Sequence, residues 1–174
     1  WLEQAFIIYP CARYDLQGKN ILKTQEKYYL SDVSLKYSLL GYNRKMLDGV
    51  MENIVFLELK RRGYEVFVGK NDTKEIDFVA IKDGKKCFIQ VAYLLASEET
   101  IQREFGAYSK ITDASPKYVM SLDKLDMSHD GIVHMNIIDF LLRKKDLGLL
   151  PLAHHCCHLP CGVCHFHDRT LCCL

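Results

Sequence analysis

Three oxygen-bearing side chains, Glu52, Asp77 and Gln90, are the residues of this sequence best suited to chemistry. Asp77 and Gln90 each stand inside an apolar run, where an acid or an amide ordinarily has a polar partner. Hard divalent cations such as Mg²⁺ bind oxygen ligands, usually one or two carboxylates together with water. A cation held in this way can activate water and stabilise the leaving oxygen in phosphodiester cleavage. The three residues therefore predict a metal-dependent phosphodiesterase site if the fold brings them together.

The pair Asp83-Gly84 makes the meeting of Asp77 and Gln90 testable, because it is a strong signal for a two-residue hairpin turn. With this turn, Asp77 lies directly opposite Gln90. The same register puts Glu75 opposite Ala92. Residues paired in this way have Cβ atoms about 4.5–5.5 Å apart. Side-chain alternation also places Glu75 and Asp77 on the same face of their strand.

Glu52 belongs to the strongest helix signal in the chain, at residues 47–62, where apolar residues recur at helical spacing and Gly63 follows as a C-terminal cap. It lies at the flank of the apolar stripe, so it can face along the sheet toward Asp77 and Gln90. The alternative for Glu52 is an ordinary solvated acid. The alternative for Gln90 is a buried amide that satisfies backbone groups.

The remaining signals order the chain as an α/β domain. Before the long helix we expect strands at residues 5–14 and 21–22, a β-like run at 27–30 and a short helix from residues 31 or 32 to 39. After it we expect strands at 64–68, 75–81 and 86–94, a helix at 97–111, a strand at 117–121 and a final helix at 135–143.

Composition favours one globular domain, because the 174 residues are 49% apolar and 26% charged. The net charge of +1 gives no average signature of nucleic-acid binding, so any basic surface must be local. Apolar runs are too short for a membrane span, and no signal peptide is recognisable. Only Cys11 and Cys87 lie in the body, which indicates a cytoplasmic protein. The first residue is Trp1, and we interpret the chain as part of a longer protein.

Seven short stretches, taken in order, resemble a domain of unknown function that is found C-terminal to an AAA-type ATPase module in many bacterial and archaeal ATP-binding proteins. They are residues 27–32, Asp48-Gly49 with Glu52-Asn53, residues 59–63, 75–78, 89–93 and 103–105, and Pro116-Lys117. The resemblance covers nearly all of residues 1–142. It implies an upstream AAA-type ATPase partner. The chain has no G-x-x-x-x-G-K-[ST] loop, so ATP would bind only through that module.

That family is similar in fold to the PD-(D/E)XK nucleases, which implies a restriction-endonuclease-like core with a central mixed sheet flanked by helices. The resemblance matches Glu52 to the helix glutamate, Asp77 to the strand aspartate and Gln90 to the Glu/Gln of the next strand. Glu52 and Asp77 would then hold Mg²⁺. The lysine of the motif would stand at position 92, where this chain has Ala92. Losing such a charge-stabilising group costs on the order of 10²–10³ in rate.

A basic side chain could reach the site from elsewhere, and Lys70, Lys74 and Arg103 are the candidates in sequence. Three hypotheses follow. The first is a catalytically degenerate nuclease-fold module that docks DNA or a protein partner for the ATPase. The second is an active Mg²⁺-dependent DNA nuclease with a relocated lysine. The third is a purely structural interaction domain.

Residues 154–173 contain five histidines and six cysteines. Cys161 and Cys164 form a C-x-x-C knuckle, and with His158 and His165 they could make a tetrahedral zinc site. There is no second knuckle at zinc-finger spacing, so we favour an incidental, disordered tail over a designed zinc site. The chain is thus divided into a β/helical lead-in at residues 1–46, a nuclease-like core at 47–145 and a Cys/His-rich tail at 146–174.

Overall fold

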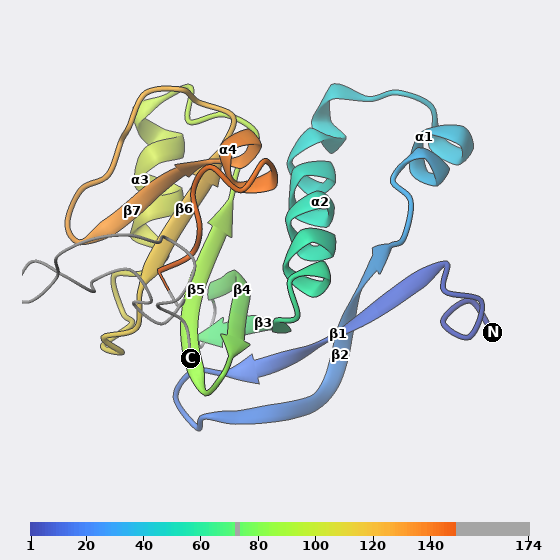
Figure 1. Ribbon diagram of the computed structural model, residues 1–174, viewed down its shortest axis with the longest axis horizontal. Coiled ribbons are helices and arrows are strands. Elements are labelled where there is room, and N and C mark those ends of the chain that lie inside the picture. Colours follow the sequence, from blue (N-terminus) through green and yellow to red (C-terminus); the bar gives the residue numbers. More distant parts are fainter. Residues whose placement is uncertain (72–73, 149–174) are drawn as a thin grey trace, which may run out of the picture.

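The structure, a computed structural model, describes residues 1–71 and 74–148. Within these residues the chain forms a seven-stranded mixed sheet in the order β2-β1-β3-β4-β5-β6-β7 (Figure 1). Neighbours run antiparallel in β1–β2, β3–β4 and β4–β5, and parallel in β1–β3, β5–β6 and β6–β7. The strands are β1 (Ile8–Asp15), β2 (Asn20–Leu30), β3 (Glu65–Asn71), β4 (Lys74–Lys82), β5 (Lys85–Val91), β6 (Lys117–Ser121) and β7 (Ile132–Asn136).

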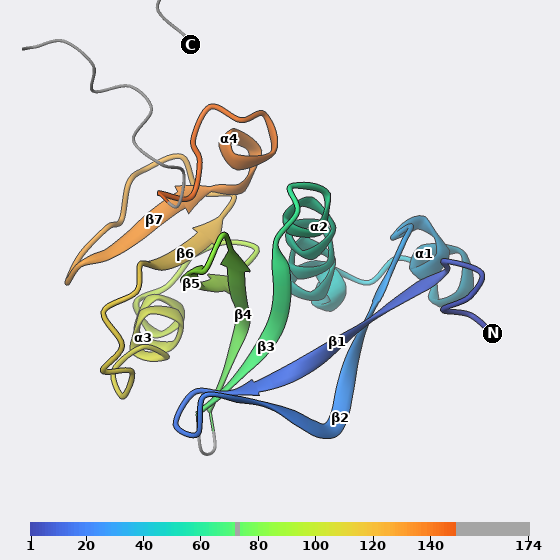
Figure 2. The ribbon, with the colours of Figure 1, turned by 60° about the horizontal axis from the view of Figure 1, so that its bottom comes forward.

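Helices cover both faces of this sheet. The long α2 (Leu47–Arg61) and the short α4 (Ile137–Leu141) lie on one face, and α3 (Glu98–Gly106) lies on the other (Figure 2). A short α1 (Ser34–Leu40) and the 3-10 helix η1 (Arg44–Met46) connect β2 to α2. Two buried clusters match the two faces, one containing Phe56 and Phe140 and the other containing Phe88 and Phe105. The expected α/β class, with a central mixed sheet flanked by helices, is confirmed.

The predicted succession of helix, three strands, helix and strand is confirmed in α2, β3, β4, β5, α3 and β6. Residues 21–22 and 27–30 are parts of one long strand, β2, which joins the same sheet as the strands of the predicted core. Within the described ranges, no helix is long and apolar enough to cross a membrane.

The end of the sheet differs from the prediction. The helix expected at residues 135–143 is wrong at its start, because Met135 belongs to β7, which pairs in parallel with β6. Asn136 then caps the shorter α4 by accepting hydrogen bonds from the N–H groups of Ile138 and Asp139. The helix expected at 97–111 ends at Gly106. A buried hydrogen bond from Tyr108 Oη to the Tyr118 carbonyl, 2.5 Å long, holds the chain against β6 just beyond that point.

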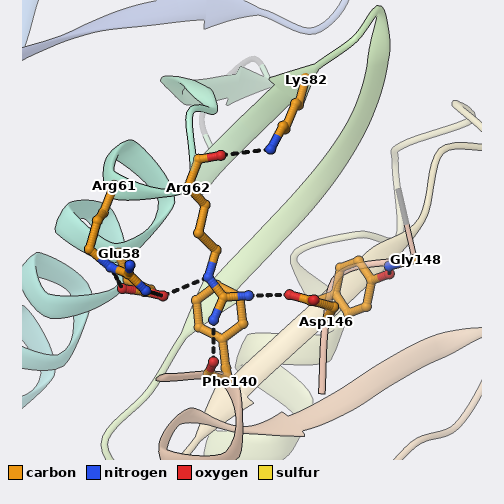
Figure 3. A network of polar contacts seen from close by, with 8 residues as sticks. Glu58, Arg61, Arg62, Lys82, Phe140, Asp146 and Gly148 are labelled. Atoms are coloured by element: carbon orange, nitrogen blue, oxygen red, sulfur yellow. Dashed lines mark hydrogen bonds and ion pairs between the residues drawn. The ribbon is translucent and has the colours of Figure 1, made fainter. Parts of the chain in front are cut away.

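The C-terminal end of α2 is fixed by a dense polar network (Figure 3). The Glu58 carboxylate accepts hydrogen bonds from Arg61 at 2.7 Å and from Arg62 at 2.6 Å. The Arg62 guanidinium also pairs with Asp146, donates to the Phe140 carbonyl and lies 4.0 Å from the centre of the Phe140 ring. One buried arginine therefore ties α2 to the segment that follows β7.

Candidate active site

Asp77 and Gln90 meet where β4 and β5 separate. The turn at Asp83-Gly84 has the positive φ angles of 51° and 71° that a two-residue hairpin requires. The pairing from Lys82–Lys85 to Phe78–Ile89 follows the predicted register. Beyond Phe78, side chains replace the backbone partners. The Asp77 N–H donates to Gln90 Oε1 at 3.2 Å, and the Val91 N–H donates to Asp77 Oδ2 at 2.8 Å.

A β-bulge turns Asp77 out of the regular strand pattern. β3 pairs Phe67 with Val79 and Gly69 with Ile76, so two residues of β4, Asp77 and Phe78, face one residue of β3. Ile76 and Val79 therefore both pack in the cluster under α3. A Cβ atom on Gly69 would lie 3.0 Å from Ile76 Cβ and 3.0 Å from Val79 Cγ2. A glycine at position 69 is thus what allows the bulge to close against β3.

The bulge and the strand separation correct the prediction for Glu75 and Ala92. Glu75 pairs with Lys70 across β3, and its carboxylate forms an ion pair with Arg13 of β1. Ala92 is only 1% exposed, and its N–H donates to the Met120 carbonyl of β6 at 2.9 Å. The pairing of β4 with β5 has ended before these positions, so the expected apposition of Glu75 and Ala92 is not formed. Glu75 is therefore not directed at Ala92.

The Glu52 side chain accepts hydrogen bonds from two residues of β2. Its Oε1 atom accepts from Lys27 Nζ at 2.5 Å and from Tyr29 Oη at 2.5 Å. The ring of Tyr29 is buried and stacks on Phe56 of α2, with ring centroids 4.1 Å apart. The helix acid predicted from the sequence is therefore present beside the sheet, with a lysine and a tyrosine bound to the same carboxylate oxygen.

A backbone clamp positions these donors. The Asn53 side chain accepts from the Leu30 N–H at 2.8 Å and donates to the Leu30 carbonyl at 2.8 Å. This pair of bonds fixes the end of β2 against α2. Because side chains alternate along a strand, Lys27 and Tyr29 share one face of β2, and the clamp holds that face against Glu52.

The charges of this site act on one another. Burial first, and then the negative charge of Glu52, raise the pKa of Asp77 to about 7. The Val91 N–H and the positive charge of Lys27 act in the opposite direction without cancelling the rise. Burial, followed by the charge and hydrogen bond of Glu52, also raises the pKa of Tyr29 well above its ordinary value. Lys27, Glu52 and Asp77 are thus one electrostatic unit.

Lys27 is the basic residue that sequence reasoning missed. Of the expected candidates, Lys74 donates to the Gly106 carbonyl at 3.5 Å, and Arg103 pairs with the buried Glu104 at 2.7 Å. Lys70 lies on β3, where its backbone pairs with Glu75. Lys27 and Tyr29 stand two residues apart just before Leu30, but the bonds from Asn53 that bring this segment to α2 are tertiary contacts that the sequence pattern does not indicate.

The described side chains do not form a metal centre of three or more acid, histidine or cysteine ligands. Glu52 Oε1 already accepts two hydrogen bonds, and Gln90 Oε1 accepts one from the backbone. The zinc site considered for Cys161, Cys164, His158 and His165 lies outside the described residues.

A second polar cluster, Ser121, Asp123 and His134, has the residue types of a nucleophilic triad but not its geometry. Ser121 Oγ donates to Asp123 Oδ2 at 2.7 Å and lies 2.9 Å from His134 Nε2. The Met127 N–H donates to His134 Nδ1, so the ring proton is on Nε2 and the ring cannot accept the Ser121 proton. Ser121 is fully buried, and Asp123 also accepts from the Leu95 N–H at 2.7 Å. The cluster ties β6 and β7 to the end of β5.

Comparisons with known proteins give relatives without an assigned activity. The chain is 38% identical over 143 residues to an uncharacterised protein of Haemophilus influenzae, a match covering 82% of this chain and 35% of that protein. It is 32% identical over 114 residues to an uncharacterised protein of Methanocaldococcus jannaschii, a match covering 63% of this chain and 24% of that protein. No family model and no solved structure matches the chain. The chain thus spans about a third and about a quarter of the length of these relatives.

Proposed function

We propose that this chain is a PD-(D/E)XK-type nuclease-fold module that binds DNA without cleaving it. The observation that carries the proposal is the state of Glu52, whose Oε1 atom is held by Lys27 and Tyr29 at 2.5 Å each. A nuclease needs its acids open toward a metal and the attacking water. Here Glu52 Oε1, Asp77 Oδ2 and Gln90 Oε1 each accept hydrogen bonds from groups of the chain itself, and the charge of Glu52 acts on Asp77.

The position of Ala92 supports loss of cleavage. The motif's lysine position is a buried alanine whose backbone is bound to β6. Gln90 stands where an acid would strengthen cation binding, and its oxygen accepts the Asp77 N–H. Each change removes charge or a ligand from the place where cleavage would need it.

A local basic and aromatic surface supports docking of DNA despite the near-neutral net charge. Lys36, Arg44 and Lys45 lie along the segment from α1 to the start of α2. Tyr42 is exposed in the same segment and stacks on Tyr37, with ring centroids 6.0 Å apart. Cations that contact phosphates and aromatic rings that stack on bases are the elements of single-stranded DNA binding.

Fluorescence anisotropy with a labelled single-stranded oligonucleotide tests the docking. We expect binding at low salt that weakens steeply as salt rises. The double substitution Arg44→Gln with Lys45→Gln should weaken binding and lower the salt slope by about 1.4, since each lost phosphate contact removes about 0.7 from it. The control is Lys85→Gln, which removes a positive charge beside the Asp83-Gly84 hairpin turn, outside the segment from α1 to α2. Absence of binding at low salt would instead favour a protein partner or a structural domain.

A second candidate, an active metal-dependent DNA nuclease, is favoured by one observation. Lys27 reaches the acids from β2 and could serve as the relocated lysine. Incubation of DNA with the protein and Mg²⁺ or Mn²⁺, with Asp77→Ala as the control, separates the two. We expect no cleavage by either protein. Cleavage that disappears in the Asp77→Ala variant would overturn the first proposal.

We also propose that the module serves an AAA-type ATPase in the same protein. The two relatives are much longer than the matched segment, which leaves room for such a module in them. ATP hydrolysis by the full-length Haemophilus influenzae relative, measured with and without DNA, tests this association. Lack of any ATPase activity would contradict it.

A further inference from the structure

We propose that Lys27 is the resident cation of this site, so that its ion pair with Glu52 and the binding of a divalent metal exclude each other. The inference rests on the proposed function, because it explains how a nuclease-like set of acids is kept from working as a metal centre. It assigns to Lys27 a role opposite to that of a catalytic lysine, which acts together with the metal.

The contacts of Glu52 are the first support. Lys27 Nζ and Tyr29 Oη both lie 2.5 Å from the same carboxylate oxygen. Tyr29 is buried and stacked on Phe56, so it cannot leave without disrupting the core. The Lys27 side chain is 34% exposed, whereas that of Glu52 is 13% exposed. Lys27 is therefore the donor that can swing into solvent when another cation arrives.

The charge balance is the second support. Glu52 and Asp77 are two acids near each other, and Lys27 brings a single positive charge to them. A divalent ion that entered beside Lys27 would be repelled by the ammonium group at short range, in surroundings less polar than water. Removing that ammonium group leaves the acids without a cation, which is the condition that favours Mg²⁺ or Mn²⁺.

Access to the site is the third support. A cavity of about 300 Å³ is lined by Lys27, Tyr29, Lys36, Glu52 and Asn53, together with other residues of β2, α1 and α2. Through this cavity an ion can approach Glu52 from the side of Lys27, whereas Asp77 is not among the lining residues. It also contains a second lysine, Lys36, and no described ion pair joins Lys36 to Glu52.

Titration of the purified chain with Mn²⁺, followed through the electron paramagnetic resonance signal of the free ion, tests the exclusion. We expect the Lys27→Met variant to bind Mn²⁺ about tenfold more tightly than the wild type, or better. The Lys36→Met variant removes the same charge from the same cavity and should change the affinity by less than about threefold. Adding Asp77→Asn to Lys27→Met should return the affinity to the wild-type level or below it.

Two results would overturn the inference. One is a Lys27→Met variant that binds Mn²⁺ no more tightly than the wild type. The other is an equal gain from Lys36→Met, which would show a general charge effect. Should Lys27→Met fail to fold by circular dichroism, Lys27→Gln replaces it with the same expectation. DNA binding and cleavage are measured separately, so wild-type cleavage would refute the proposed function while the Mn²⁺ affinities still decide the role of Lys27.

Discussion

Glu58 of α2 and Asp77 of β4 are two acids whose surroundings shift their pKa values in opposite directions. Burial alone would raise the pKa of Glu58, but hydrogen bonds from Arg61 and Arg62 outweigh it and hold the pKa below its ordinary value. For Asp77, burial and then the negative charge of the nearby Glu52 raise the pKa to about 7. The Glu58 carboxylate is thus compensated by its two arginines, whereas Asp77 is the more weakly compensated acid of the two.

The largest effect is expected when Glu58 loses the hydrogen bonds of its buried arginine. The Arg62 side chain is only 6% exposed. Arg62→Met therefore removes a buried hydrogen-bond donor from Glu58, Asp146 and the Phe140 carbonyl. We expect a loss of about 3 kcal/mol in the free energy of unfolding, measured by urea denaturation. Arg61→Met is the control, because Arg61 is 56% exposed and should cost far less. Equal losses in the two variants would show that Arg62 has no special role.

Gly69→Ala tests the surroundings of Asp77, because it disturbs the bulge in which Asp77 lies. The new Cβ atom would press on Ile76 and Val79 at 3.0 Å. We expect a loss of about 2 kcal/mol in unfolding free energy. Gly106→Ala, at a position where no atom lies within 4 Å of the added Cβ, should be neutral or slightly stabilising. A Gly69→Ala protein as stable as the wild type would mean that the bulge does not need the glycine.

The smallest effect is expected from Asp77→Asn, which keeps an acceptor for the Val91 N–H. The pKa of Asp77 is about 7 in the folded protein, against an ordinary value of 3.8. The folded state therefore binds the extra proton between these values, and this stabilisation, full below pH 4, is lost as the pH rises through 7. The variant should melt about 3 °C above the wild type at pH 8 and close to it at pH 4.

Asp113→Asn is the control of opposite sign for this pH dependence. Hydrogen bonds from Lys86 and Ser115 outweigh burial and hold the pKa of Asp113 well below its ordinary value. The stability from this group is present at neutral pH and is lost at strongly acidic pH. Asp113→Asn should therefore lower the melting temperature at pH 8. An Asp77→Asn variant that also melts lower at pH 8 would contradict the assignment of Asp77 as under-compensated.

What the sequence could predict was local. The Asp83-Gly84 turn has one preferred geometry, and this alone set the register that brings Asp77 to Gln90. The spacing of apolar residues gave α2 to within a residue. The bulge at Asp77 could not be predicted in the same way, because it depends on Gly69 of a neighbouring strand.

The donors of Glu52 and the last strand were missed for a similar reason. Lys27 lies 25 positions before Glu52, and only the packing of β2 against α2 makes them neighbours. β7 is only five residues long, and it pairs in parallel with β6. Interactions of this kind depend on tertiary packing, which no window of the sequence contains.

The clamp between Asn53 and Leu30 has a consequence for how β2 can change. Both described side-chain bonds of Asn53 go to the backbone of residue 30, so they fix the position of the chain there and do not depend on the side chain at position 30. An insertion of one residue between Lys27 and Leu30 would turn the lysine to the opposite face of the strand. An insertion of two would restore the face but carry the ammonium group about 7 Å away. The charge at Glu52 is therefore set by the length of this segment as much as by its composition.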